Sequence, residues 1–109
     1  MKIFLIFCLI IPVFSYSQKV FSVEYQNQSD ISVFVVEYEN LCDLKVFKVD
    51  YPNQAQGNAG LWHYVDYPNQ ADKNIFFVEY ANQSDLKVFF VEYRNQAGWR
   101  NSEKKALLY

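Results

Sequence analysis

Residues Ile75 to Lys87 read IFFVEYANQSDLK, and this thirteen-residue pattern recurs along most of the chain. Other copies begin at Val20, Val33, Val46, Trp62 and Val88, and a shortened one runs from Lys104 to Tyr109. Each copy contributes one motif tyrosine, namely Tyr25, Tyr38, Tyr51, Tyr67, Tyr80, Tyr93 and Tyr109. The first three intervals between consecutive tyrosines recur in the same order as the last three, so the array repeats as two halves.

The two halves match when Tyr25 is aligned with Tyr67, which is a 42-residue shift. From Tyr25/Tyr67 to Ala55/Ala97, 19 of 31 aligned pairs are identical. Self-similarity at this level indicates an internal duplication, and repeated units of this kind bury a continuous core only when they pack on one another. We therefore expect two equivalent halves within one domain.

Each copy is typical of a β-strand, because Val, Phe and Tyr favour a pleated surface and side chains alternate between its faces. In the fifth copy one face carries Phe76, Val78 and Tyr80, and we expect this face to be the core. The other face begins with Ile75 and ends with Glu79. Its middle position holds Ser, Val, Lys, Tyr or Phe in different copies, and we expect it to be semi-exposed.

The Asn-Gln-Ala/Ser-Asp segment after each strand is typical of a turn, since Asn tolerates left-handed backbone and Asn and Asp bond nearby N–H groups. Helix is not expected, because no segment keeps a 3.6-residue apolar period. A motif that recurs at a regular interval indicates units related by rotation, and closure would remove exposed strand edges. The sequence predicts an all-β, closed repeat assembly of seven short strands with a 42-residue duplication. Residues Lys104 to Tyr109 would be the seventh strand.

The repeat VFFVEYxNQAD, the connections Gly57–Trp62 and Gly98–Lys105, and the ending LLY resemble the septoil-knot domain family of small exported bacterial proteins. The resemblance covers essentially all of residues 19–109. It implies a closed β structure whose backbone forms a seven-crossing torus knot. The sequence departs from the pattern at Leu41-Cys42 and at His63. The family carries no known catalytic residues to transfer.

Residues 1–17 have the features of a secretory signal peptide. Lys2 precedes an apolar run from residue 3 to 14, and Ser15 and Ser17 stand at the −3 and −1 positions before Gln18. The run is about a dozen residues, whereas a membrane span needs about 20. We expect cleavage before Gln18, a single β-repeat domain over residues 18–109, a periplasmic or secreted location, and no membrane span after cleavage.

Charge and cysteine content exclude two classes of interaction. The formal net charge is −2, whereas nucleic-acid binding draws most of its affinity from basic residues, so no nucleic acid is expected. After cleavage Cys42 would be the one remaining cysteine, so no internal disulfide can form. Cys42 replaces Ala or Ser in a turn, and we favour a small semi-buried residue over a Cys42-linked dimer.

Neither a metal nor a cofactor is expected. Calcium needs six to eight oxygens from a compact site, but the acids at each repeat position come singly, mostly 13 residues apart. Zinc needs three or four ligands, which one His and one Cys do not supply. His63 occupies a position otherwise filled by Phe, and we expect a packed imidazole satisfied by backbone. The alternative is a small periplasmic hydrolase that uses His63 with a nearby carboxylate such as Asp66.

The two longer connections interrupt the repeat, and each carries a tryptophan. Irregular loops on a rigid scaffold are a usual place for binding, although glycine can also let the chain cross while a tryptophan fills the ring. The sequence predicts a non-catalytic exported structural or binding module that contacts protein or glycan. The residues predicted to bind are Trp99, Arg100, Arg94, Trp62 and His63.

Overall fold

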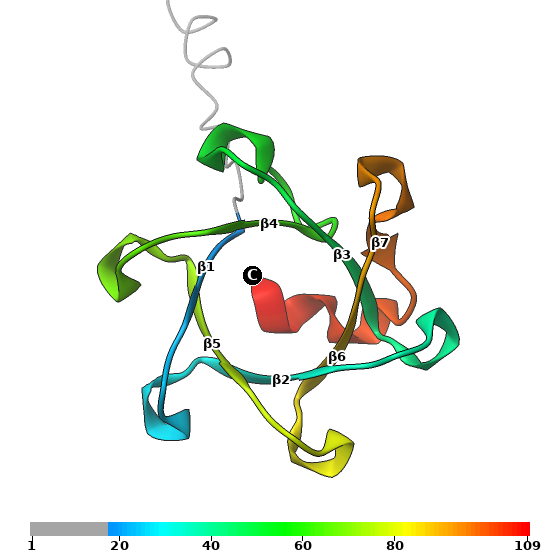
Figure 1. The fold of residues 1–109 in the computed structure, drawn as a ribbon, viewed down its shortest axis with the longest axis horizontal. Helices are drawn as coiled ribbons and strands as arrows, with labels where there is room; N and C mark the ends of the chain where they lie inside the picture. The colour runs from blue at the N-terminus through cyan, green and yellow to red at the C-terminus, as the bar shows by residue number, and fades with distance from the viewer. Residues whose placement is uncertain (1–17) are drawn as a thin grey trace, which may run out of the picture.

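The computed structural model describes residues 18–109, so the predicted signal peptide lies outside the described residues. Seven strands are present, and they are β1 (Lys19–Ser22), β2 (Ile31–Val35), β3 (Leu44–Lys48), β4 (Leu61–Tyr64), β5 (Lys73–Phe77), β6 (Leu86–Phe90) and β7 (Gly98–Trp99). Six of them form a closed ring in the order β4-β1-β5-β2-β6-β3, which a β3–β4 pairing completes (Figure 1). All pairings in the ring are parallel, and β7 adds antiparallel to β3. The predicted closed all-β fold is confirmed.

The chain passes twice around this ring. Strands β1, β2 and β3 form the first lap, and β4, β5 and β6 fill the gaps between them on the second. The first-lap strands begin at Lys19, Ile31 and Leu44. The second-lap strands begin at Leu61, Lys73 and Leu86, and each start is displaced from its first-lap counterpart by the same 42-residue shift. A strand therefore rarely pairs with its neighbour in sequence.

The interior belongs to the face that the sequence assigned to the outside. The first apolar residue of each full copy has no exposed surface, and these residues are Val20, Val33, Val46, Trp62, Ile75 and Val88. The phenylalanines on the predicted core face are only half-buried, and the motif tyrosines of the arms are 63–64% exposed. The core-face prediction was wrong for the Phe and Tyr positions, although Val23, Val36 and Val49 of that face are buried. Each strand leaves the barrel after a few residues, so its later side chains lie outside the interior.

Every ring interface has the same stagger between its two strands. Val33 lies beside Phe77, Val46 beside Phe90, and Val20 beside Tyr64. Each middle-position residue therefore lies next to a fully buried residue of the adjacent strand. The middle positions form the layer at the end of the barrel where the strands finish, and we call this layer the mouth. Its residues are Ser22, Val35, Lys48, Tyr64, Phe77 and Phe90.

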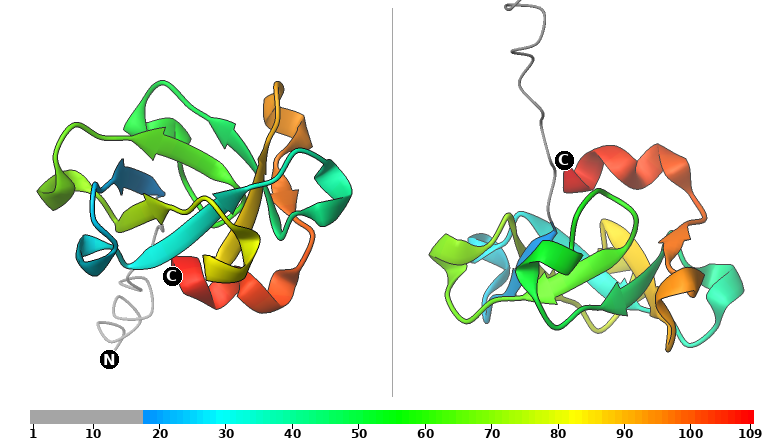
Figure 2. Two further views of the ribbon diagram at one scale, coloured as in Figure 1. Left: turned by 60° about the horizontal axis from the view of Figure 1, so that its bottom comes forward. Right: turned by 90° about the horizontal axis from the view of Figure 1, so that it is seen from above.

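The opposite end of the barrel is covered by the C-terminal segment. Residues 104–108 of the predicted strand Lys104–Tyr109 instead belong to a 3-10 helix, η9 (Ser102–Leu108), which lies across the ring (Figure 2). Leu108 is buried in the core, and its carbonyl accepts a hydrogen bond from the Gln18 side chain (3.0 Å). The seventh-strand placement was wrong because the β3–β4 pairing already closes the ring. Within residues 18–109, no helix has the length and apolar character that a membrane span requires.

The repeated aspartates connect neighbouring strands. Each carboxylate accepts a backbone N–H from the start of an adjacent strand, and the pairs are Asp30 with Asn74 (2.7 Å), Asp43 with Lys87 (2.9 Å), Asp72 with Lys19 (2.9 Å) and Asp85 with Ser32 (2.9 Å). Parallel strands in a ring begin with unpaired N–H groups, and a carboxylate is a strong acceptor for them. These aspartates therefore fix the stagger between strands.

Candidate functional site: the clefts between the arms

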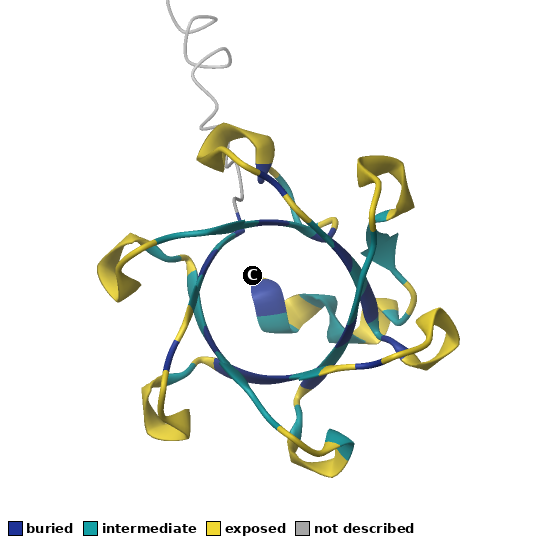
Figure 3. Ribbon diagram, viewed as in Figure 1, coloured by how far each residue is buried: buried dark blue, intermediate teal, exposed yellow. Residues whose placement is uncertain are grey.

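Six arms project from the barrel, and each ends in a short 3-10 turn. These turns are η3 (Gln26–Gln28), η4 (Glu39–Leu41), η5 (Pro52–Gln54), η6 (Pro68–Gln70), η7 (Ala81–Gln83) and η8 (Arg94–Gln96). A motif tyrosine precedes each turn in extended conformation, and the tips are exposed all around the ring (Figure 3). In the described part of the chain only glycines have positive φ, so the expected left-handed asparagines are absent there.

Backbone hydrogen bonds hold each tip in a fixed shape. The Gln28 N–H donates to the Tyr25 carbonyl (3.0 Å), and the same bond recurs in the other arms. In two arms the glutamine side chain also accepts the tyrosine N–H, from Tyr51 to Gln54 (3.1 Å) and from Tyr93 to Gln96 (3.2 Å). The exposed tyrosines are thus carried on ordered turns.

A cleft of about 370 Å³ lies between the arm of β1 and the neighbouring arm of β4. Its lining includes Phe21, Glu24, Tyr25 and Gln28 from one arm. Pro68, from the tip of the next arm, forms the facing wall. One cleft therefore combines apolar ring surface with hydrogen-bonding groups.

The same combination recurs at the next strand of the ring. The cleft beside β5, of about 520 Å³, is lined by Phe76, Glu79, Tyr80 and Gln83, with Gln26 from the neighbouring tip. Each of these residues occupies the repeat position of its counterpart in the first cleft. The clefts are therefore a product of the repeat itself.

A third copy of the cleft lies beside β4 and has a volume of about 620 Å³. His63 stands where the other clefts have Phe, Asp66 supplies the carboxylate, and Gln70 supplies the amide. Pro52 of the adjacent tip forms the wall. This copy is more polar than the other two because an imidazole replaces the phenyl ring.

The motif acids in these clefts are open to a ligand. Glu24, Asp66 and Glu79 are exposed, and none of them takes part in an ion pair within the described region. The ion pair found there joins Lys45 of β3 to Glu39, on the tip of another arm, at 3.6 Å. Each cleft thus offers an aromatic ring beside an unpaired carboxylate and an amide.

His63 is half-buried, and its ring is engaged with the backbone. Nδ1 lies 3.2 Å from the Val49 carbonyl oxygen, which satisfies one of the two ring nitrogens. Within residues 18–109, no carboxylate forms a hydrogen bond with this ring. The packed-imidazole interpretation matches this placement, although the ring also lines the cleft with Asp66.

The two tryptophans have structural partners. Trp62 is 0% exposed and fills the barrel interior, so it forms no part of a binding surface. Trp99 packs against the core, and its Nε1 donates to the carbonyl oxygen (2.9 Å) and the Oδ1 (3.3 Å) of Asn58. Trp62 fills the ring, as the alternative interpretation expected, whereas Trp99 packs against the core from β7.

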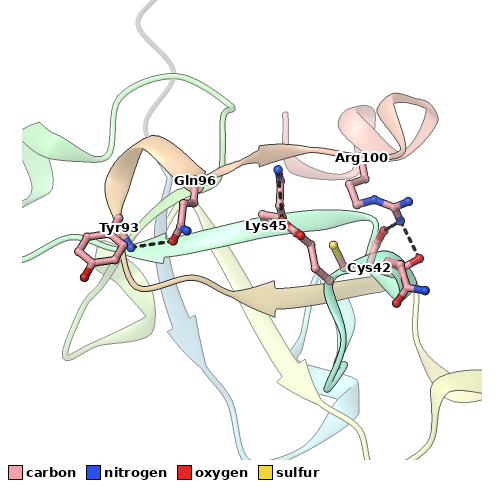
Figure 4. A network of polar contacts seen from close by, with 7 residues as sticks. Cys42, Lys45, Tyr93, Gln96 and Arg100 are labelled. Carbon is pink, nitrogen blue, oxygen red and sulfur yellow. Dashed lines mark hydrogen bonds and ion pairs between the residues drawn. The ribbon is translucent and has the colours of Figure 1, made fainter.

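The two arginines bind backbone of other arms. Arg100 donates to the carbonyls of Asn40 (2.8 Å) and Cys42 (3.2 Å), as Figure 4 shows. Arg94 lines a cleft of about 600 Å³ with Leu61, and it donates to the Gln54 carbonyl (3.3 Å). The structure therefore does not gather the five predicted binding residues into one patch.

Cys42 lies in the interior beneath Arg100. It is a free thiol, it is buried, and its burial raises the pKa of the thiol, while the Arg100 charge acts in the opposite direction. A buried thiol of this kind packs as a small apolar residue.

The carboxylates do not converge on a metal site. Within residues 18–109, no three His, Cys, Asp or Glu side chains lie close enough together to hold an ion. The repeated aspartates instead accept backbone N–H groups, as described above.

Sequence reasoning missed the cleft residues because it placed the tyrosines in the core. A signal was present, since all seven motif positions hold tyrosine and none holds phenylalanine. A purely apolar environment gives no reason to keep the hydroxyl, whereas an exposed or hydrogen-bonding position does. The invariance of tyrosine across copies therefore indicated a surface role.

Comparison with known proteins identifies the family to which this fold belongs. Searches of curated proteins and of solved structures gave no match. The 7(1) septoil knot domain matches residues 17–100, which is more than three quarters of the 109 residues. The chain belongs to the 7(1) septoil knot domain family.

Proposed function

We propose that this protein is a non-catalytic binding module that holds a saccharide in the clefts between its arms. The observation that carries the proposal is the recurrence of one cleft, with ring, carboxylate and amide at the same repeat positions, beside β1, β4 and β5. A sugar ring has apolar C–H faces and many hydroxyls. An aromatic ring accommodates the face, and carboxylate and amide oxygens accept the hydroxyl protons.

The volumes fit a ligand of this size. The three clefts measure about 370, 620 and 520 Å³, within the range of about 300–1,000 Å³ typical of small-molecule sites. They are lined by exposed arms, so a longer chain could pass from one cleft to the next. A single site of this kind is expected to be weak.

Repetition compensates for weak individual sites. When a ligand carries several binding units, the second contact forms at high effective concentration, and avidity can exceed the single-site affinity by about 10²–10⁴. The arms that line the clefts project around the ring at pseudo-equivalent positions (Figure 3). A polymer or a surface coated with glycan is therefore the favoured target.

A hydrolase is the weaker alternative. Polar groups that recur in the three clefts beside β1, β4 and β5 are a regular part of the repeat, whereas a catalytic site is a local exception to a repeat. His63 is such an exception, but a general base needs a proton to abstract and a partner within hydrogen-bond reach. Its Nδ1 is engaged with the Val49 carbonyl instead.

The proposed location is outside the cytoplasm. This part of the proposal rests on the apolar run and the Ser-x-Ser pattern before Gln18. The intact mass of the exported protein tests it. A mass that begins at Gln18 supports the proposal, and a mass that retains residues 1–17 refutes cleavage.

Binding to a glycan array tests the main proposal. The wild-type protein should bind a subset of immobilised glycans, and a variant that removes one carboxylate and one amide (Glu79→Ala with Gln83→Ala) should bind them more weakly. Glu103→Ala, an exposed acid on η9, is the matched control and should bind like wild type. The proposal fails if no glycan binds, or if variants in all three clefts bind like wild type.

A further inference from the structure

The mouth of the barrel is the interior layer that the repeat does not keep constant. Its six residues are Ser22, Val35, Lys48, Tyr64, Phe77 and Phe90, whereas the layer below is uniformly apolar. In a repeat protein, a position whose residue type differs between copies can give one end of the barrel a binding property that the repeat itself does not supply.

The ammonium of Lys48 at the mouth lies over two aromatic rings. Lys48 Nζ lies 5.0 Å from the centre of the Tyr64 ring and 4.8 Å from that of Phe90. An ammonium is attracted to ring faces at these distances. Lys48 is exposed, and within the described region it has no carboxylate partner. The partners of its ammonium among the described residues are therefore two aromatic rings.

The two ends of the barrel differ in whether a segment of the described chain covers them. Leu108 of η9 covers the end where the strands begin, and Leu107 packs beside it. The mouth has no comparable cover within residues 18–109. Val35 is 41% exposed, and Phe77 and Phe90 pack on the core while keeping part of their surface accessible. Apolar surface that surrounds an unpaired cation favours an anionic ligand with an apolar body.

Tyr64 adds a hydrogen-bond donor to this surface. Burial raises the pKa of its hydroxyl to about 12, so the group keeps its proton at any ordinary pH. A protonated phenol can donate to an anion, whereas a phenolate would repel it.

We propose that the mouth binds a small organic anion with a flat apolar body, such as an aromatic carboxylate or sulfonate. The Lys48 ammonium pairs with the anionic group, and Phe77, Phe90 and Tyr64 take the apolar part. The mouth adjoins the clefts between the arms, because Tyr64 and Phe77 also line two of them, but Lys48 and Phe90 line none of the three. The proposal does not depend on the function of the clefts.

A matched pair of fluorescent probes isolates the contribution of the charge. 1-Anilinonaphthalene-8-sulfonate carries the anion, and N-phenyl-1-naphthylamine has the same ring system without it. The wild-type protein should bind the sulfonate more tightly than the neutral probe. Lys48→Met should weaken sulfonate binding about tenfold or more and leave the neutral probe within about twofold, because one charge-assisted contact is lost.

Three comparisons complete the test. Lys48→Arg should retain sulfonate binding, and Lys45→Met, on the opposite face of β3, should bind like wild type. Near-UV circular dichroism of each variant shows whether it keeps its tertiary packing, and Lys48→Arg serves as the readout if Lys48→Met does not. The Glu79→Ala, Gln83→Ala variant should bind the sulfonate like wild type. The proposal is wrong if wild type binds neither probe, if Lys48→Met and Lys45→Met act alike, or if Lys48→Arg loses the sulfonate.

Discussion

The side-chain amide of Gln18 donates a hydrogen bond to the carbonyl oxygen of Leu108 at 3.0 Å, although the two residues lie 90 positions apart. Gln18 immediately precedes β1, and Leu108 ends η9. The bond joins the first strand of the barrel to the helix that covers it, so both ends of the described chain meet at one end of the ring. The cover over this end of the barrel thus depends on residues near the chain ends, which are commonly the most dispensable part of a domain.

Removal of the Leu108 side chain should be costly. Leu108→Ala leaves a cavity over the barrel end and should lower the free energy of unfolding by about 2–5 kcal/mol. Leu41→Ala is the matched control, because Leu41 is 55% exposed and Leu108 is 2% exposed. Denaturant melts of both variants measure the difference. Equal losses would show that η9 does not seal the core.

The same Val→Ala substitution at two positions of one strand should lower the free energy of unfolding by different amounts, according to how deeply each side chain is buried. Val33 and Val35 share the interior face of β2, but Val33 is 0% and Val35 is 41% exposed. Val33→Ala should destabilise the protein by about 2 kcal/mol, and Val35→Ala by less than about 1 kcal/mol. If Val35→Ala costs as much as Val33→Ala in a urea titration, the mouth is buried in solution.

The aspartate bridges should be worth more than the exposed motif acids. Asp85 accepts the N–H of Ser32, a buried residue, so Asp85→Ala leaves that donor unpaired and should cost about 1–3 kcal/mol. Glu79→Ala removes an exposed carboxylate and should change stability by less than about 0.5 kcal/mol. Thermal melts at neutral pH distinguish the two. A larger loss for Glu79 would mean that the roles of the two sets of acids are reversed.

The sequence repeat allowed the overall architecture to be predicted. The effects of ring closure on the interior face and on the C-terminal segment could not be predicted. The 42-residue shift predicted two equivalent halves, and the strand pairs β1/β4, β2/β5 and β3/β6 obey it. The interior face was misassigned because Phe76 and Ile75 are both apolar, and alternation alone does not say which face a barrel will enclose. The segment predicted as the seventh strand is helical over residues 104–108 because the ring is already closed. That closure depends on the β3–β4 pairing and not on the segment's own residues. The knot stays a prediction of the family resemblance.

The site was harder to predict than the fold. Each cleft combines residues of one copy with the tip of an arm that is adjacent only in the ring, as Phe21 and Pro68 show. These two segments lie side by side because the chain passes twice around the ring, and no local sequence pattern predicts that contact. Among the residues selected from the sequence, His63 does line a cleft, whereas Trp62 lies in the core.

The titration of Tyr64 should make the protein less stable at high pH. Burial raises its folded-state pKa from 10.0 to about 12, so the folded state holds the proton more tightly than the unfolded state does. The stability from this group is complete below pH 10 and is lost as pH rises from 10 towards 12. Tyr64→Phe should therefore flatten the fall in denaturation midpoint between pH 10 and 12. Burial also raises the pKa of Cys42 from 9.0, but that effect is common to both proteins and cancels in the comparison. Parallel pH profiles for the two proteins would rule out a buried Tyr64 hydroxyl.

Nuclear magnetic resonance can locate the ligand on the arms most directly. The isotope-labelled domain is titrated with the oligosaccharide that binds best on the array, and backbone amide shifts are followed. The account predicts progressive shifts at equivalent positions of several clefts, including Gln28, Gln70 and Gln83, with little change at η9. Shifts confined to η9 or to the barrel mouth, with the three glutamines unmoved, would contradict a binding role for the clefts.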